Sequence, residues 1–434
     1  MGKGSVCIDG FNLALPKGSG IATYGRNLLE AIEGTGLEAQ VLFGPAAGIS
    51  RKHPLLNEIA ITDAFTPEPR PWRRAWATAT ARFGCEAWPV EPSDQVIWPA
   101  RGGGRPRAER YWVSPQLFHT ANRAFRASRT FTPVRFGGVA PAPDLMHWTT
   151  ALPLCAPGRP NLYTVHDLIP LRLPHATLDN KRAFFQLMRR IARRADHIAV
   201  VSEATKRDLQ SLFGVPDERV SVTWQAVSLP ERLTALPEAT AAAEVEAVFR
   251  VPWKGYFLFF GAVEPKKNLA RVVEAYLASG AAQPLIVVGG KGWLEEDELA
   301  LLKQARRDKR VRRDKIKLWE HLPFSMLVQL VRGARATLFP SLYEGFGLPV
   351  LESMLLGTPV ITSTAGSLPE VAGDAALSVD PYDTRALTEA IRALSADDDL
   401  ALELATRGRA QAARFSPQAH RARLAALYAR LGAG

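Results

Sequence analysis

Short apolar runs alternate with amphipathic stretches along most of the chain. The runs are three to five residues long, rich in Val, Ile, Leu and Phe, and typical of buried strands. Between them, apolar residues recur at helical spacing, as in the stretch after Asn268, which we expect to cap its helix. Strands that alternate with helices predict parallel sheets covered on both faces. The expected strands are 6–9, 40–43, 161–165, 197–201, 220–224, 256–260, 285–288, 316–319, 336–339, 360–362 and 376–379.

The pattern is interrupted in two places and divides the chain into two α/β domains. Residues 1–227 predict an N-terminal Rossmann-like domain, with a helical insertion over about 44–142 that is rich in Pro, Arg and Trp. Residues 228–254 predict a linker with one alanine-rich helix, and 255–416 a second Rossmann-like domain. The segment 417–434 predicts an amphipathic helix that packs back onto the first domain. Two doubly wound domains would face each other across a cleft, and ligands of such sheets bind at the carboxyl ends of strands.

Composition narrows the class of protein. The chain has 434 residues and a net charge of +11, from 54 Lys and Arg against 43 Asp and Glu. Such an excess favours anionic partners, but no nucleic-acid-binding motif is present, so we expect no specific nucleic acid. Three well-separated cysteines match no metal spacing and indicate a reducing compartment. With neither a signal peptide nor an apolar run of ~18 residues, we expect a cytoplasmic protein.

The segment 341–352 carries the clearest candidate chemistry. Glu344 and Glu352 have seven residues between them, and Gly345, Gly347 and Pro349 lie in that interval. An apolar run precedes the segment, and Pro favours the first turn of a helix, so the pattern predicts strand, glycine turn and helix start. A helix start binds phosphate through free N–H groups, and carboxylates on either side can hold sugar or ribose hydroxyls.

Three further clusters follow predicted strands. Lys266 and Lys267 precede a helix start and favour a diphosphate, although an ordinary basic loop is the alternative. Gly18 and Gly20 follow the first strand and let the backbone approach a ligand closely, although a plain turn is equally consistent. His166 follows the strand 161–165 and can contact a sugar hydroxyl or serve a structural role.

Together these motifs resemble family 4 glycosyltransferases of the GT-B fold. The resemblance rests on the E-x7-E segment 340–352 and on 357–361 (GTPVI), 367–373 (SLPEVAG), 264–268 (EPKKN), 164–168 (TVHDL) and 201–206 (VSEATK). It covers both halves, about 300 residues, but not the insertion. Many relatives have an arginine where this chain has Ala262. The branch with a small residue there commonly transfers mannose or rhamnose, which favours GDP-mannose as the donor.

The resemblance implies a role for each matching residue. Glu344 would contact the donor sugar, His166 would touch it, and Lys267 would neutralise the diphosphate; these three are the expected catalytic groups. Lys266 would be a donor-binding residue, in reserve for Lys267. Glu352 would bind the ribose. The rest of the donor site would come from backbone, at Gly345, Phe346, Gly347, Leu348, Gly18 and Gly20. The family implies retention of anomeric configuration, a nucleotide sugar as substrate, no metal and no cofactor, and a hexose transferred to a glycan or lipid-linked acceptor of surface polysaccharide or lipopolysaccharide.

One stretch outside these motifs suggests a membrane contact. Trp72, Trp76 and Phe83 can share one helix face with arginines alongside, which suits an anionic bilayer surface; packing onto the same domain is the alternative. Other readings of the whole chain also stay open. They are a transferase for another nucleotide sugar (UDP-, ADP- or dTDP-linked), an epimerase or phosphorylase on the same scaffold, a non-catalytic sugar-nucleotide scaffold, and a nucleic-acid binder.

Overall fold

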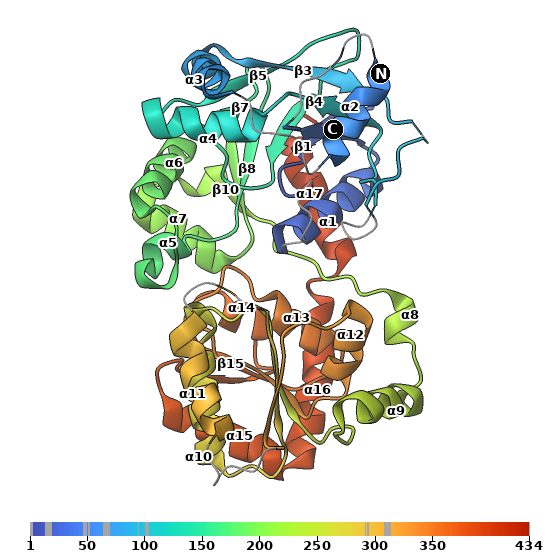
Figure 1. Ribbon diagram of the computed structural model, residues 1–434, viewed down its shortest axis with the longest axis vertical. Coiled ribbons are helices and arrows are strands. Elements are labelled where there is room, and N and C mark those ends of the chain that lie inside the picture. Colours follow the sequence, from blue (N-terminus) through green and yellow to red (C-terminus); the bar gives the residue numbers. More distant parts are fainter. Residues whose placement is uncertain are drawn as a thin grey trace.

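The structure is a computed structural model in which two domains lie one above the other along the long axis (Figure 1). It describes residues 3–13, 20–46, 50, 53–63, 70–93, 95–99, 104–290, 292, 295–307 and 314–433. The N-terminal half forms one domain around a large sheet, and the segment after the linker forms the other. This arrangement is the α/β, two-sheet GT-B architecture that the sequence predicts.

The N-terminal sheet has ten strands in the order β10-β9-β8-β6-β1-β2-β4-β3-β5-β7. Its middle is parallel, and β1 lies between β2 and β6 with every residue buried. A strand that is buried on both faces has a continuous apolar run, which explains why β1 and β8 were visible in the sequence. The strands are β1 (Ser5–Asp9), β2 (Glu38–Phe43), β3 (Cys85–Val90), β4 (Arg110–Val113), β5 (Thr132–Phe136), β6 (Leu145–Trp148), β7 (Leu154–Cys155), β8 (Asn161–Val165), β9 (His197–Val200) and β10 (Val220–Val222).

The C-terminal sheet has six parallel strands in the order β13-β12-β11-β14-β15-β16. Successive residues of β11 enter two different cores: Phe257 and Phe259 pack on one face of the sheet, Leu258 and Phe260 on the other. Both faces are therefore covered by helices, as a doubly wound sheet requires. The strands are β11 (Phe257–Phe260), β12 (Leu285–Val288), β13 (Ile316–Trp319), β14 (Ala336–Phe339), β15 (Val360–Ser363) and β16 (Leu377–Val379).

Helices connect nearly all of these strands, and their starts follow ordinary capping chemistry. The Ser202 hydroxyl accepts the N–H of Thr205 at the start of α7. The helices of the N-terminal domain and linker are α1 (Gly20–Gly34), α2 (Pro54–Thr62), α3 (Pro71–Thr80), α4 (Leu117–Ser128), α5 (Ile169–Arg172), α6 (Lys181–Arg194), α7 (Glu203–Phe213), α8 (Glu231–Thr234) and α9 (Glu238–Phe249). The later ones are α10 (Leu269–Ser279), α11 (Glu295–Arg307), α12 (Phe324–Arg332), α13 (Leu348–Leu355), α14 (Leu368–Ala372), α15 (Thr384–Ala396), α16 (Asp398–Ala413) and α17 (Pro417–Arg430). Short 3₁₀ turns are η1 (Ala81–Phe83), η3 (Pro174–Ala176), η4 (Asp217–Arg219) and η5 (Pro265–Lys267).

The segment 44–142 is not the purely helical insertion that the sequence predicts. It contributes α2, α3 and α4, but also β3, β4 and β5, which extend the N-terminal sheet. Pro89 and Pro133 lie inside β3 and β5, and Pro normally argues against a strand. The antiparallel pairing of β3 with β4 also departs from the βα alternation. Because of these two features, the sequence pattern does not predict β3, β4 and β5.

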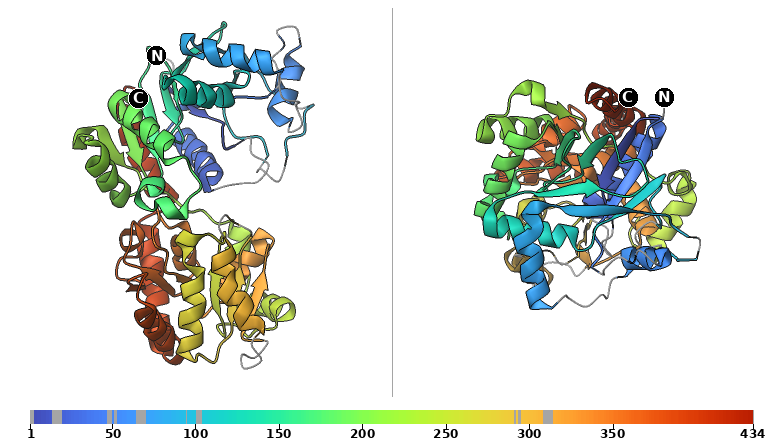
Figure 2. Two further views of the ribbon diagram at one scale, coloured as in Figure 1. Left: turned by 60° about the vertical axis from the view of Figure 1, so that its left-hand side comes forward. Right: turned by 90° about the horizontal axis from the view of Figure 1, so that it is seen from above.

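The last helix, α17, returns to the N-terminal domain and lies beside α1 (Figures 1 and 2). The Tyr428 hydroxyl lies 2.9 Å from His147 Nδ1 on β6, and His147 Nε2 lies 2.8 Å from the Thr164 hydroxyl on β8. Burial lowers the pKa of His147 to about 3, so its ring is neutral at physiological pH. The chain thus crosses between the domains twice. Among the described helices, none has the length and apolarity needed to cross a membrane.

Candidate active site

The segment 341–347 forms a tight turn between β14 and α13. Ser367 fastens this turn from the next loop, because its hydroxyl lies 3.0 Å from the Glu344 carbonyl oxygen and 2.7 Å from that of Phe346. Gly347 is the N-cap of α13 at φ 111°, a conformation that L side chains rarely adopt. The glycine turn and helix start that the sequence predicts are therefore both present, with Leu348 as the first helical residue and Pro349 as the second.

The start of α13 offers unpaired backbone donors. Within the described residues, the N–H groups of Phe346, Gly347 and Leu348 have no acceptor. The Phe346 side chain is buried against Phe415, so only the backbone of this residue can face a ligand. Free N–H groups and the positive end of a helix dipole attract an anion.

Two lysines flank the carboxylate of Glu344. Lys267 Nζ lies 2.5 Å from Glu344 Oε1, and Lys266 Nζ lies 3.9 Å from Oε2 and 3.3 Å from Glu264. Burial by itself raises the pKa of Glu344, but Lys267 and Lys266 outweigh it and hold the pKa below its usual value. Burial likewise lowers the pKa of Lys266, which its neighbouring carboxylates raise overall. Glu344 is therefore a carboxylate beside two ammonium groups.

Glu352 lies one turn into α13 and differs from Glu344 in its surroundings. No described residue donates a hydrogen bond to its carboxylate. Burial raises its pKa to about 7, and the charge of Lys267 only partly offsets this. The side chain is thus a carboxyl group near the start of a helix, and it has no hydrogen-bond partner among the residues that the structure describes.

Asn268 corrects one expectation about this region. It is the N-cap residue of α10 in the left-handed region at φ 64°, but its side chain does not cap the helix. Instead its amide donates to the carbonyl oxygens of Pro340 (2.9 Å) and Pro381 (2.8 Å). Because Pro340 immediately precedes the 341–347 turn, this amide fixes the lysine-bearing turn η5 against it.

The N-terminal domain contributes a neutral histidine. His166 Nε2 lies 2.8 Å from the carbonyl oxygen of Thr149, which can only accept, so Nε2 carries the hydrogen. Nδ1 then accepts from the Gln225 amide at 3.3 Å, and burial lowers the pKa of His166 to about 4. Thr149 is itself held by Asp9, whose carboxylate accepts the Thr149 N–H. The ring orientation is therefore fixed by groups at the ends of β1, β6 and β10.

The two domains meet at this turn. A Cβ on Gly345 would lie 2.4 Å from the carbonyl oxygen of His166, so only glycine allows this approach. A Cβ on Gly20, at the start of α1, would lie 3.9 Å from the Leu348 side chain at the start of α13. The helix starts of α1 and α13 thus face each other across the domain boundary. Gly18, the other glycine of the first loop, lies outside the described residues.

Sequence reasoning missed the contacts that α7 makes to the turn. The Tyr343 hydroxyl donates to Asp208 on α7, and Arg172 pairs with the same carboxylate at 3.4 Å. The Thr205 hydroxyl donates to the His166 carbonyl oxygen at 3.2 Å. Only the motif VSEATK hinted at α7, and it gave no partner. Within the described residues, no group of three His, Cys, Asp or Glu side chains could hold a metal.

Comparison with known families agrees with this geometry. Residues 76–229 match the family model described as "Glycosyltransferase Family 4", and residues 247–411 match "Glycosyl transferases group 1". The two matched regions include the turn, the lysine pair, His166 and α7. The chain belongs to glycosyltransferase family 4.

Curated relatives of this family 4 chain match over part of their length. The chain is 35% identical over 260 residues to the O-antigen chain mannosyltransferase B of Escherichia coli, and the match covers 58% of this chain and 66% of that protein. It is 28% identical over 230 residues to the O-antigen chain mannosyltransferase RfbU of Salmonella typhimurium, with 53% and 59% covered. The chain thus matches about two thirds or less of the length of these relatives.

Solved structures share the fold over nearly the whole chain. Sucrose-phosphate synthase from Thermosynechococcus elongatus superimposes with a TM-score of 0.68 at 19% identity, and covers 99% of this chain and 100% of that one. WaaG, a glycosyltransferase involved in lipopolysaccharide biosynthesis, gives a TM-score of 0.58 at 15% identity, with 97% and 99% covered. At these identities the likeness is one of fold, and the fold of this family 4 chain is GT-B.

Proposed function

We propose that this protein transfers a hexose, mannose from GDP-mannose, to a glycan or lipid-linked acceptor during O-antigen or other surface polysaccharide assembly in the cytoplasm. Two relatives named as O-antigen mannosyltransferases support the choice of sugar and pathway. The family supports a nucleotide sugar as the donor.

The observation that carries the proposal is the lysine pair on Glu344 beside the free N–H groups of α13. A sugar nucleotide leaves as a diphosphate whose charge grows while the glycosidic bond loosens. Lys267, 2.5 Å from Glu344, is placed to shift toward that charge, and the N–H groups at the start of α13 donate to the same oxygens without reorganisation. These groups supply the positive charge that a divalent cation supplies elsewhere, so the reaction proceeds without a metal.

The remaining groups divide the donor between them. Glu344 holds hydroxyls of the sugar near the reacting carbon, and Glu352, which has no described partner, accepts the ribose hydroxyls. His166 reaches the sugar from the N-terminal domain as a neutral ring. The acceptor hydroxyl attacks from the face on which the phosphate leaves, which retains the anomeric configuration.

A donor screen tests this function. Thermal unfolding is measured with GDP, UDP, ADP, dTDP and the corresponding sugar nucleotides, since a ligand that binds only the folded state stabilises it. GDP and GDP-mannose are expected to raise Tm selectively. A selective rise in Tm with a nucleotide of another base would show that the donor carries that base instead of guanine. A shift with no transfer to extracted glycan or lipid-linked acceptors would favour a non-catalytic sugar-nucleotide scaffold.

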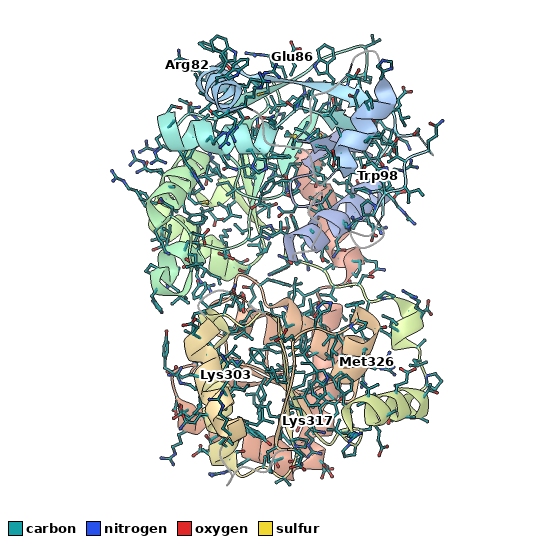
Figure 3. All side chains as sticks on the ribbon, in the orientation of Figure 1. Arg82, Glu86, Trp98, Lys303, Lys317 and Met326 are labelled. Carbon is teal, nitrogen blue, oxygen red and sulfur yellow. The ribbon has the colours of Figure 1, made fainter. Side chains whose placement is uncertain are left out.

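The exposed face of α3 and η1 suits a membrane-linked acceptor, and we propose that it docks on an anionic bilayer. Trp72, Trp76 and Phe83 are 61%, 70% and 62% exposed, and α3 has no buried residue. The guanidinium of Arg73 lies 5.2 Å from the Trp72 ring and that of Arg82 lies 4.7 Å from the Phe83 ring. Figure 3 shows Arg82 at the end of the N-terminal domain that points away from the C-terminal domain.

Vesicle sedimentation tests this contact. Binding to vesicles with anionic lipid is expected, with loss at high salt, because aromatic rings insert at the interface while arginines meet the headgroups. Replacing Trp72, Trp76 and Phe83 by Ala should abolish binding, whereas Tyr382→Ala, which removes a 60% exposed ring of the other domain, should not. Equal binding by both variants, or binding to nucleic acid instead, would contradict the proposal.

A further inference from the structure

One carboxylate of the C-terminal domain collects hydrogen bonds from the N-terminal domain. Glu370, on α14, accepts the N–H of Glu203 with both oxygens at 2.9 Å and the N–H of Ala204 at 3.4 Å. The indole N–H of Trp224 donates to the same carboxylate. All three donor residues precede the linker, so this carboxylate spans the domain boundary.

The donors are the free N–H groups at the start of α7. The Ser202 hydroxyl already accepts the N–H of Thr205 at 3.0 Å. Glu370 accepts the N–H groups of the first two helical residues, Glu203 and Ala204. An anion at this end is also favoured by the dipole of an eleven-residue helix. In the described part of the chain, Glu370 forms no ion pair with Lys or Arg. Its charge is therefore balanced by the start of α7 and the indole.

This contact is joined to both sides of the candidate active site. On one side, α14 begins after Ser367, whose hydroxyl holds the carbonyl oxygens of Glu344 and Phe346. On the other, the first turn of α7 carries Thr205, whose hydroxyl lies 3.2 Å from the carbonyl oxygen of His166 and 3.5 Å from that of Gly345. A change in the Glu370 contact must therefore change how His166 sits relative to Glu344.

We propose that Glu370 is a positioning residue that sets the N-terminal domain, and with it His166, against the 341–347 turn. It acts through α7 and touches no substrate. The catalytic part of this inference rests on the proposed function, in which His166 and Glu344 share the donor sugar. The structural part, in which the Glu370 carboxylate holds the start of α7 and so acts as an interdomain clamp, is independent of that function.

Glu370→Gln tests the clamp, because an amide keeps the shape but cannot accept with both ends. Hydrogen exchange at the amides of Glu203 and Ala204 should accelerate at least about ten-fold, because the loss of one charge-assisted hydrogen bond makes local opening easier by about that factor. Affinity for the nucleotide should stay nearly unchanged, because Lys267, Glu352 and the start of α13, which we propose bind it, lie within the C-terminal domain, while kcat falls about ten-fold. The matched control is Glu389→Gln, an exposed carboxylate of the same domain that pairs with Arg385.

Two results would overturn the inference. Unchanged exchange at Glu203 and Ala204 would remove the clamp, whatever the activity. A fall in nucleotide affinity equal to the fall in kcat would show that Glu370 acts inside the C-terminal domain. If Glu370→Gln fails to fold, Trp224→Phe removes one donor and keeps a ring, and it should show smaller changes of the same kind. If the wild-type protein transfers no sugar, the proposed function fails, while the exchange experiment still decides the clamp.

Discussion

The two sides of the candidate active site differ in charge. The C-terminal side concentrates ions: Lys266 and Lys267 place their Nζ atoms 3.9 Å and 2.5 Å from Glu344, and Lys266 also lies 3.3 Å from Glu264. The N-terminal side presents the neutral ring of His166 and the backbone near Gly20, with one buried acid, Asp167, that interacts with Lys266. A diphosphate needs compensating charge, and a sugar or acceptor hydroxyl needs only dipoles. This asymmetry supports our proposal that the nucleotide binds to the C-terminal domain and the hydroxyl-rich groups bind at its boundary with the N-terminal domain.

Of the substitutions considered, Lys267→Ala should lower catalytic efficiency the most. We expect a fall in kcat/KM on the order of 10²-fold, as for removal of other preorganised electrostatic groups. Steady-state transfer from the donor identified in the screen measures it. Lys266→Ala is the matched comparison and should cost less, because Lys266 lies farther from Glu344 and also pairs with Glu264. Equal activities of the wild type and Lys267→Ala would refute the diphosphate role.

Glu352→Gln should lower nucleotide affinity about ten-fold or more, the value of a hydrogen bond to a charged group. In the wild type, affinity should also rise as pH rises through about 7, because the pKa of Glu352 lies there and only the carboxylate accepts two hydroxyls. Calorimetric titration over about one pH unit on each side of that pKa measures both effects. A pH-independent wild-type affinity, or an unaffected variant, would remove the ribose role.

The same pKa has a consequence for stability. The pKa of Glu352 is raised from 4.5 to about 7, so the folded protein holds this proton more tightly than the unfolded chain does. The contribution of this residue to the free energy of unfolding is therefore present below pH 4.5 and is lost as pH rises through about 7. Denaturant titrations at several pH values should show that the free energy of unfolding changes with pH differently in the wild type and in Glu352→Gln. The same pH dependence in both proteins would contradict the raised pKa of Glu352.

His166→Asn probes the neutral side and should have a smaller effect. We expect kcat to fall about ten-fold, the value of one hydrogen bond, with no change in affinity for the nucleotide diphosphate, which lacks the sugar. Because burial lowers the pKa of His166 to about 4, the wild-type rate should show no inflection from this ring between neutrality and mild acid. A loss of nucleotide affinity in the variant would place His166 on the charged side instead.

Removal of divalent metal should have the smallest effect. The lysines and the start of α13 already provide positive charge at the proposed diphosphate position, so transfer in excess chelator should equal transfer without it. If chelator abolishes activity and Mn²⁺ restores it, the lysines and the start of α13 do not supply enough positive charge without a metal.

Sequence reasoning succeeded where the local structure depends on a short contiguous segment. The spacing of Glu344 and Glu352 around Gly347 and Pro349 predicts a strand, turn and helix start, because each residue type has a local conformational preference. It also located the lysine pair and the strand before His166. Longer buried strands were equally visible, since their apolar runs are continuous.

It failed where partners come from distant parts of the chain. Asn268 was expected to cap α10 but binds the carbonyl oxygens of Pro340 and Pro381, a choice that depends on how two loops pack. β3 and β5 were missed because a neighbouring strand, not their own pattern, makes them strands. The orientation of His166 by Thr149 and Gln225 was invisible for the same reason.

The sequence by itself determined the class of fold and the family, because local periodicity gives the first and contiguous motifs give the second; it also located the groups that we propose hold a diphosphate. Only the tertiary structure decided how charge is distributed over the site: two carboxylates eight positions apart in sequence have a lowered pKa in one case and a raised pKa in the other. Only it joined Glu370 to α7, across 167 positions of sequence. Burial and long-range pairing set both outcomes, and neither is written in the spacing of residues along the chain.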